Sequence, residues 1–440
     1  MAAVKRSRES KSSLALLGGP KAVRQAPGDL FTWPIVTKED EQAVLGVLRR
    51  GAMSGSDETR KFEAAMARWH GMKYALGYCN GTAALLGGMW GCRLGVGDEL
   101  ICPSLTYWAS ALPALSLGAT INFADVDPDT LCIDPADIEH RIGPRTKAIM
   151  VVHLCGHPCD MDPILKIARK HKVKVIEDVS HAHGGLYKGR LVGTLGDVAC
   201  MSLMSGKALA TGEAGMLLTD NRTIYERAVA FGFYERTGKS RWASASGFAL
   251  TDPELIQFAG LPLGGYKHRM NQTCSAMGLV QLKHYRRRVA DIQKAMNYFW
   301  DRLEGTPGVR PHRVKTPRST MGGWYAPAGL YVPEELGDLS VDKFCEAARA
   351  EGSPLNPLVI LSLHLHPMLH DADVYGHGRP TVIANARRDV RQGPGSLPAT
   401  EAARQRGFMV PWFKHYRRAA IDEYVAAIRK VAAHASELLA

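Results

Sequence analysis

The chain has no long hydrophobic run. Its longest mostly apolar stretch, the Ala, Leu and Pro mixture from Ala109 to Ala119, is shorter than the roughly 18 residues that a membrane-spanning helix requires. The basic N-terminal residues 1–13 are not followed by the apolar stretch and small-residue cleavage site of a secretion signal. The sequence therefore predicts a cytoplasmic protein without a membrane segment.

Regular disulfide spacing is also absent. The nine cysteines are an odd number spread along 440 residues, in mostly apolar surroundings, which favours reduced thiols in a cytosolic enzyme. One group of histidines and cysteines would permit zinc by composition, but its spacings match no standard four-ligand signature, and we expect no metal. The group consists of His153, Cys155, His157, Cys159, His181 and His183.

Two nucleotide-binding signatures fail on spacing. Gly238-Lys239-Ser240 resembles the end of a P-loop, but Phe233 stands where the first glycine is required, and no Gly-x-Gly-x-x-Gly follows an expected strand. The 55 Lys and Arg against 43 Asp and Glu give a net charge of +12. These charges are dispersed, and their short runs at 286–288 and 387–391 are not interleaved with aromatics. An ATPase, a Rossmann dehydrogenase and a nucleic-acid-binding protein are disfavoured.

Short apolar runs typical of strands alternate with helical stretches in the first half of the chain. This alternation predicts an α/β fold with a mostly parallel central sheet sandwiched by helices. The expected strands are Glu99–Cys102, Thr120–Phe123, Ala148–His153, Val173–Ile176, Ala199–Leu203 and Met216–Thr219, and the expected helices between them include Thr82–Cys92, Trp108–Leu117 and Pro163–His171.

Three parts are expected along the chain. They are an N-terminal arm over 1–29, a large domain over 30–285 and a smaller C-terminal α+β domain over 286–440. The last boundary is set near Tyr285, where a long helix rich in Arg and Lys is expected to begin. The Gly- and Pro-rich stretch 370–398 predicts a long loop near a site or an interface.

Polar residues that follow apolar strands are the first candidates for a site, because ligands of parallel sheets bind at the carboxyl ends of the strands. Asn80-Gly81-Thr82 opens a helix whose N–H groups could hold a phosphate, although an ordinary helix cap explains the same residues. Asp178 ends a strand, with His181 close behind. A carboxylate there can pair with a protonated ring nitrogen and a histidine can donate to a phenolate oxygen, the alternative being a solvated turn.

A lysine lies between the last two expected strands of the sheet. Lys207 is flanked by Gly206 and Gly212, a position from which a buried, deprotonated amine could attack a carbonyl. The alternative is a surface lysine in a turn.

Together these segments resemble the DegT-type sugar aminotransferases, which are fold-type I pyridoxal-phosphate enzymes. The similarity covers nearly the whole chain, and several motifs in order are far more specific than any one of them. The motifs are Leu14–Val23, Asn80–Leu85, Pro103–Ser110, Glu177-Asp178 with His183-Gly184, Tyr187–Gly193, Ser202–Lys207 and Gly265–Met270.

The resemblance implies a catalytic pair. Lys207 would hold pyridoxal 5'-phosphate covalently and later act as the acid and base of the proton shift. Asp178 would keep the pyridine nitrogen protonated, which makes the ring an electron sink.

The resemblance also implies the other cofactor contacts. Gly81, Thr82 and Ser202 would hold the phosphate, Tyr107 would stack on the ring and His181 would contact the phenolic oxygen. The active site would be shared across a homodimer, with the loop that carries Lys267 and Arg269 reaching into the partner's site.

The expected activity is the transfer of an amino group from L-glutamate or L-glutamine to a keto-sugar or keto-cyclitol, in amino-sugar, aminocyclitol or antibiotic biosynthesis. Lys267 and His181 stand where many relatives carry Asn and Gln, which favours the subgroup that acts on cyclitol ketones such as scyllo-inosose. Two alternatives stay open, a sugar dehydratase, in which histidine commonly stands at the position of Lys207, and a non-catalytic cofactor-binding regulator.

Overall fold

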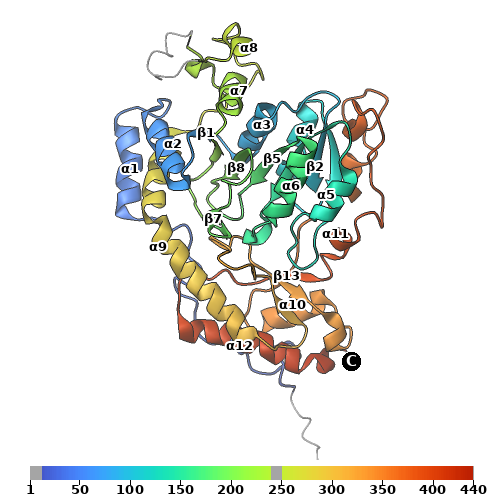
Figure 1. Ribbon diagram of the computed structural model, residues 1–440. Coiled ribbons are helices and arrows are strands. Elements are labelled where there is room, and N and C mark those ends of the chain that lie inside the picture. Colours follow the sequence, from blue (N-terminus) through green and yellow to red (C-terminus); the bar gives the residue numbers. More distant parts are fainter. Residues whose placement is uncertain (1–11, 239–249, 440) are drawn as a thin grey trace, which may run out of the picture.

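The computed structural model describes residues 12–238 and 250–439 (Figure 1). Residues 1–11 of the predicted arm lie outside the described residues, as do Lys239 and Ser240 of the P-loop-like triplet. Among the helices of the described part, none is long and apolar enough to cross a bilayer.

A seven-stranded sheet forms the centre of the larger part of the molecule, in the order β1-β9-β8-β5-β4-β2-β3. Strands β8, β5, β4, β2 and β3 are parallel, and β9 runs antiparallel to its two neighbours. The prediction of a mostly parallel sheet is confirmed. The strands are β1 (Tyr74–Tyr78), β2 (Glu99–Pro103), β3 (Thr120–Ala124), β4 (Thr146–Val152), β5 (Lys174–Asp178), β8 (Val198–Ser202) and β9 (Gly215–Thr219).

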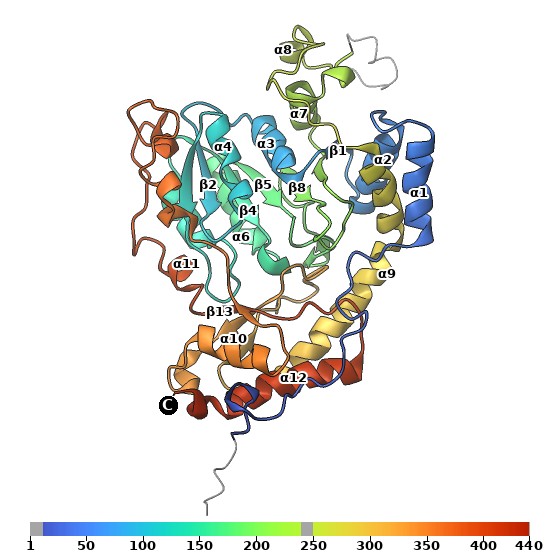
Figure 2. The same cartoon turned by 180° about the vertical axis from the view of Figure 1, so that it is seen from behind.

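Helices flank this sheet (Figures 1 and 2). The expected helix Trp108–Leu117 is two short ones, a 3-10 turn at Trp108–Ser110 and α4 (Pro113–Ser116), because Pro113 has no N–H to continue a helix and suits the first position of a new one. The other helices of this part are α1 (Lys38–Arg49), α2 (Asp57–His70), α3 (Gly81–Gly91), α5 (Pro135–Arg141), α6 (Met161–His171), α7 (Arg222–Gly232) and α8 (Pro253–Ile256), and a hairpin is formed by β6 (Leu186–Tyr187) and β7 (Arg190–Leu191).

The long helix α9 (Gln272–Leu303) begins well before the expected position near Tyr285. Asn271 caps it, accepting a hydrogen bond from the amide of Thr273 at 2.8 Å, so the basic stretch at 286–288 is its middle. Its Tyr285 packs in the core around the sheet, whereas Phe299 packs in a second core. In Figure 1, α9 runs diagonally from the sheet down to α12. The domain boundary at 285/286 stays a prediction.

The second core belongs to a smaller α+β unit at the end of the molecule opposite α7 and α8 (Figures 1 and 2). A four-stranded antiparallel sheet lies there with two helices. Its elements are β10 (Val309–Pro311), β11 (Ala328–Tyr331), α10 (Val341–Ala350), β12 (Asn356–Pro357), β13 (Gly407–Met409) and α12 (Arg418–Ala433). The intervening stretch, which contains α11 (Pro398–Ala402), returns to the larger part, where Leu363, Ile383 and Leu397 join its core.

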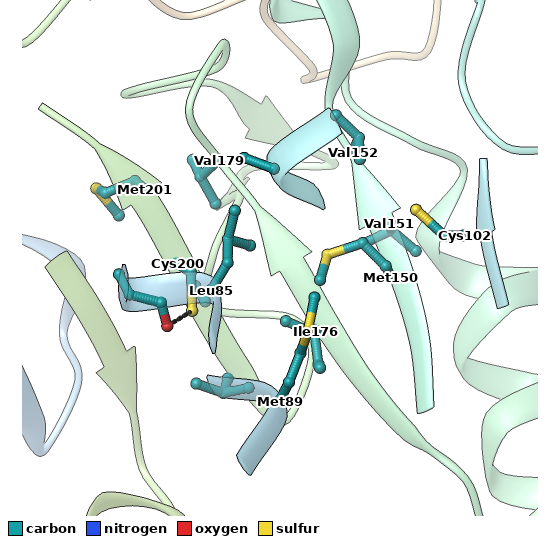
Figure 3. Packing of buried hydrophobic residues seen from close by; sticks show 14 of the residues in the cluster. Leu85, Met89, Cys102, Met150, Val151, Val152, Ile176, Val179, Cys200 and Met201 are labelled. Carbon is teal, nitrogen blue, oxygen red and sulfur yellow. Dashed lines mark hydrogen bonds between the residues drawn. The ribbon is translucent and has the colours of Figure 1, made fainter. Parts of the chain in front are cut away.

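Helix α3 lies unusually close to the sheet. A Cβ at Gly88 would come within 2.7 Å of Cys200 Sγ on β8, so glycine is required for this approach. Cys200 Sγ donates a hydrogen bond to the carbonyl of Ala84 at 3.1 Å, and Leu85 and Met89 pack against Ile176 in the same layer (Figure 3). This packing fixes the N-terminus of α3 beside the carboxyl end of β8.

Candidate active site

A cavity of about 620 Å³ opens at the carboxyl ends of β5 and β8. Its lining comes from these strand ends, the first turn of α3, the 106–110 turn and three stretches that are remote in sequence, at 325–326, 359–363 and Met409. The structure brings together there seven of the residues singled out in the sequence. They are Gly81, Thr82, Tyr107, Asp178, His181, Ser202 and Lys207.

Lys267 does not line this cavity. It is exposed on the loop that precedes α9, outside the cavity of its own chain. Its expected role in a partner's site stays a prediction.

The first turn of α3 packs directly against Ser202 at the end of β8. A Cβ at Gly81 would come within 2.6 Å of the Ser202 Cβ, so only glycine allows this contact. Asn80 accepts a hydrogen bond from the amide of Ala83 at 2.8 Å and so caps the helix. First-turn amides of a helix have no acceptor within the helix and lie at its positive end. With the hydroxyls of Thr82 and Ser202 on the cavity wall, the turn is a cradle for a phosphate.

Asp178 ends β5 and is held from two sides. Its side chain is only 5% exposed, Ser110 Oγ donates to one carboxylate oxygen at 2.7 Å and the amide of Ser180 donates to the other at 3.0 Å. Ser110 is in turn fixed by Thr106, with 3.0 Å between the two hydroxyl oxygens. The carboxylate is therefore presented to the cavity in one orientation.

His181 lies in the cavity wall as a neutral ring. Burial, with the charges of Lys207 and His183, holds its pKa well below the usual range. The amide of Cys155 donates to Nδ1 at 3.3 Å, so in the neutral ring the proton is on Nε2. Cys155 adopts a left-handed φ of +52°. His181 therefore has a hydrogen-bond donor to offer to an oxygen in the cavity.

Lys207 is a buried amine that faces an aromatic ring. Its side chain is 8% exposed and its Nζ lies 3.9 Å from the centroid of the Tyr325 ring. Burial lowers its pKa to about 8, although Asp178 and Cys155 act in the opposite direction. About a tenth of the amine is therefore unprotonated at pH 7, and this is the form that attacks a carbonyl.

Glu177 and His183, neighbours of these residues in the sequence, do not line the cavity. Glu177 is fully buried and accepts hydrogen bonds from His153 Nε2 at 3.1 Å and from the amides of Gly193, Leu195 and Gly196 at 2.7, 2.8 and 2.6 Å. Burial alone would raise its pKa, but His153 and the amides outweigh burial and lower it. Glu177 therefore ties the loop after β7 to the sheet.

Three features of the site were not predicted from the sequence. They are the contacts of Tyr325 and of Trp33 with Lys207, and the hydrogen bond by which Ser110 orients Asp178. Ser110 lies in the motif Pro103–Ser110, which indicates a position near the site but not its hydrogen bond to Asp178. Tyr325 faces the Lys207 amine and the indole N–H of Trp33 donates to the Lys207 carbonyl, but neither residue stands near a recognisable strand end in the sequence. Tyr107 is 58% exposed at the mouth of the cavity, beside Trp108.

The histidines and cysteines that allowed zinc by composition are engaged in other contacts. His153 is bound by Glu177 and by the amide of Cys159, and the ring of His157 lies tilted to that of His312, with centroids 5.2 Å apart. Over residues 12–238 and 250–439, no three His, Cys, Asp or Glu side chains are arranged to hold a metal ion.

Comparison with known proteins shows the class of this protein, a pyridoxal-phosphate-dependent aminotransferase. The chain belongs to the DegT/DnrJ/EryC1/StrS aminotransferase family, which it matches over residues 34–429. The resemblance inferred from the motifs is confirmed, as is the cofactor that it implied.

Three relatives illustrate the similarity. The GDP-perosamine synthase of Caulobacter vibrioides is 33% identical over 373 residues, 84% of this chain and 89% of that protein. The L-glutamine:2-deoxy-scyllo-inosose aminotransferase of Micromonospora echinospora is 32% identical over 346 residues, 77% of this chain and 80% of that protein. The crystal structure of an aminotransferase from Psychrobacter cryohalolentis superposes with a TM-score of 0.77 at 29% identity, covering 91% of this chain and 98% of that one.

The residues of the cavity fit pyridoxal phosphate. A glycine-dependent cradle at the start of α3 suits its phosphate, and a buried amine with a lowered pKa suits its aldehyde. An oriented carboxylate suits its pyridine nitrogen, and a neutral imidazole with Nε2–H suits its phenolic oxygen.

Proposed function

We propose that this protein transfers an amino group from L-glutamate or L-glutamine to a keto-sugar or keto-cyclitol. The family supports the transfer to a sugar, and the observation that carries the proposal is the buried Lys207 amine, which lines the same cavity as Asp178. The 2-deoxy-scyllo-inosose aminotransferase among the relatives supports a keto-cyclitol as one of the acceptors to test.

Each residue of the cavity has a proposed part. The bound cofactor supplies an electron sink for the carbon from which a proton is removed. Lys207 holds the cofactor and then, as a free amine, moves the proton, for which a pKa near 8 is well matched. Asp178 keeps a positive charge on the ring nitrogen, and His181 donates from Nε2 to the phenolic oxygen. Gly81, Thr82 and Ser202 hold the phosphate, and Tyr107 covers the ring from the mouth.

A dehydratase reaction is the alternative within the same fold. It is disfavoured by Lys207, because the residue that commonly stands there in such dehydratases is a histidine, which cannot hold the cofactor covalently. A non-catalytic regulator would have no use for a lysine whose pKa is lowered by burial toward the range of an acid-base catalyst.

We also propose a homodimer with shared active sites, acting in the cytoplasm. The placement of Lys267 outside the cavity of its own chain supports a role for this loop in a partner's site. The nine cysteines are all free thiols, which supports a reducing compartment.

The test combines a substrate panel with a variant. Purified protein is incubated with L-glutamate or L-glutamine and each of several nucleotide-linked keto-sugars and keto-cyclitols, while the cofactor spectrum and the aminated product are followed. Lys207→Ala should lose both the yellow absorbance of the covalently held cofactor and the transfer, and Lys207→Arg, which keeps the charge, should lose them too. Transfer that persists in either variant, or loss of a hydroxyl from an aminated sugar instead of transfer, would contradict the proposal.

A further inference from the structure

A second concave site lies beside the middle of α9, around Lys414. It measures about 520 Å³ and shares no lining residue with the cofactor cavity. One wall is a single face of α9, on which Arg287, Asp291 and Lys294 recur at intervals of four and three residues. The opposite wall is the segment before α12 that holds Lys414 and His415, and Ile35 closes one end.

Lys414 is a buried amine without a carboxylate partner among the described residues. Its side chain is only 6% exposed, and its Nζ donates to the carbonyl of Trp412 at 3.3 Å and lies 3.0 Å from the centroid of that indole ring. Within the described part of the chain, no carboxylate forms an ion pair with it, and burial lowers its pKa to about 6. At neutral pH the amine is therefore mostly unprotonated, and an anion bound beside it would favour the ammonium form and accept its hydrogen bonds.

Three further basic side chains, Arg287, Arg288 and Lys294, line the hollow. Arg287 and Lys294 are exposed at the rim, and Arg288 is held in the wall by the carbonyl of Ile35 at 3.0 Å and by Gln281. Asp291 is the one carboxylate of the lining. It is engaged by its own neighbours, the amide of Tyr416 at 3.4 Å and His415 Nδ1 at 3.6 Å. Cations therefore outnumber the carboxylate around the hollow.

We propose that this site binds a phosphate group, either free or carried by a small metabolite, with Lys414 as the buried anchor and Arg287 and Lys294 at the rim. Ammonium and guanidinium groups that converge on one hollow are the usual partners of phosphate in proteins. A volume of about 520 Å³ lies in the range of small-molecule sites and leaves room for a sugar-sized group beyond the phosphate itself.

The contacts of Lys414 also place this site next to the wall of the active site. Trp412, on whose ring Lys414 Nζ lies, donates its indole N–H to the carbonyl of Gly323 at 3.0 Å and contacts Tyr325, with ring centroids 5.6 Å apart. Tyr325 is the ring that faces Lys207. The rings of Trp412 and Tyr325 therefore lie between the proposed phosphate site and the cofactor cavity.

The test is isothermal titration of the full-length protein loaded with cofactor, so that the cradle at α3 is already filled. Inorganic phosphate and glucose 6-phosphate serve as probes at constant ionic strength. We expect saturable binding that Lys414→Met and Arg287→Ala each weaken by about tenfold or more, the loss expected for one charge-assisted contact. Arg286→Ala is the matched control, because Arg286 is the exposed neighbour of Arg287 and does not line the site.

The two probes and the variants separate the outcomes. Tighter binding of glucose 6-phosphate assigns the site to a phosphorylated metabolite, and equal binding assigns it to free phosphate. Absence of saturable binding by either probe overturns the proposal. Binding that is the same in Arg287→Ala as in the unaltered protein also overturns it, since the probe is then held elsewhere, the cofactor cavity included. Arg287 is exposed, so this variant is informative even if Lys414→Met does not fold.

Discussion

Trp33 donates its indole N–H to the main-chain carbonyl of Lys207 at 2.8 Å, across 174 residues of sequence. The same indole lies 6.0 Å from that of Trp412, centroid to centroid. The segment before α1 thus holds the backbone of Lys207 from outside the cavity.

This contact predicts a measurable effect of Trp33→Phe. The variant keeps an aromatic ring but leaves the Lys207 carbonyl without its donor, so the free energy of unfolding should fall by about 1 kcal/mol. Because the lysine backbone is less firmly held, we expect kcat to fall several-fold with little change in KM. Denaturant unfolding and steady-state kinetics measure the two effects, and Trp33→Ala, which also removes the ring, should be worse in both. An unaltered kcat in Trp33→Phe would refute the positioning role.

Asp178→Asn should separate activity from folding. The side chain is nearly isosteric and Ser110 can still donate to its carbonyl oxygen, so the variant should fold and retain the cofactor. Without the negative charge the ring nitrogen loses its partner, and we expect kcat to fall by about a hundredfold to a thousandfold. Single-turnover absorbance measurements give the rate, and circular dichroism verifies the fold. Turnover equal to that of the unaltered protein would be incompatible with the assigned role.

Glu177→Gln, one residue earlier, should show the opposite pattern. In the variant, the side-chain NH₂ would lie against main-chain N–H groups that donate to the carboxylate in the unaltered protein. His153 would also lose its charged partner. Breaking a buried charge network of this kind costs about 3 kcal/mol of unfolding free energy. We expect that loss in urea or guanidinium titrations, with activity per folded molecule largely retained. A variant as stable as the unaltered protein would show that the network contributes little.

The lowered pKa of Lys207 predicts a pH dependence for cofactor attachment. The unprotonated amine reacts, and burial shifts its formation from the ordinary 10.5 down to about 8. The rate at which the cofactor-free protein becomes yellow should therefore rise from pH 6.5 and level off above pH 8 to 9. Stopped-flow absorbance at saturating pyridoxal phosphate measures this rate. Because the charge of Asp178 raises this pKa, Asp178→Asn should move the midpoint to lower pH. A midpoint near 10.5 would show that burial does not act on this amine.

Much of the large part was predictable because its strands are short apolar runs with polar residues at their ends. The strand expected at 120–123 and the helix expected at 82–92 differ from the observed elements by one residue at each end or less. The start of α9 was missed because its first turns, from Gln272, are mixed polar and apolar, and only the basic stretch after them stands out.

The polar centre of the site was also accessible from the sequence, because Gly81, Asp178 and Lys207 each follow an apolar strand. The residues that tune it were not. Tyr325 and Trp33 act on Lys207 through contacts between segments far apart in the chain, and such contacts depend on packing rather than on local pattern. The same holds for the Lys414 hollow, whose two walls are separated by 120 residues or more of sequence.

Helix α9 has a mechanical consequence. From Leu279 to Leu303 it contains neither Gly nor Pro, so it has no residue at which helices ordinarily bend, and it is anchored in both hydrophobic cores. Because α9 is anchored at both ends, it resists rotation of the smaller α+β unit relative to the central sheet. We therefore expect access to the cofactor cavity to depend on its exposed rim residues Tyr107, Val359 and Leu361, which can rearrange without a movement of α9.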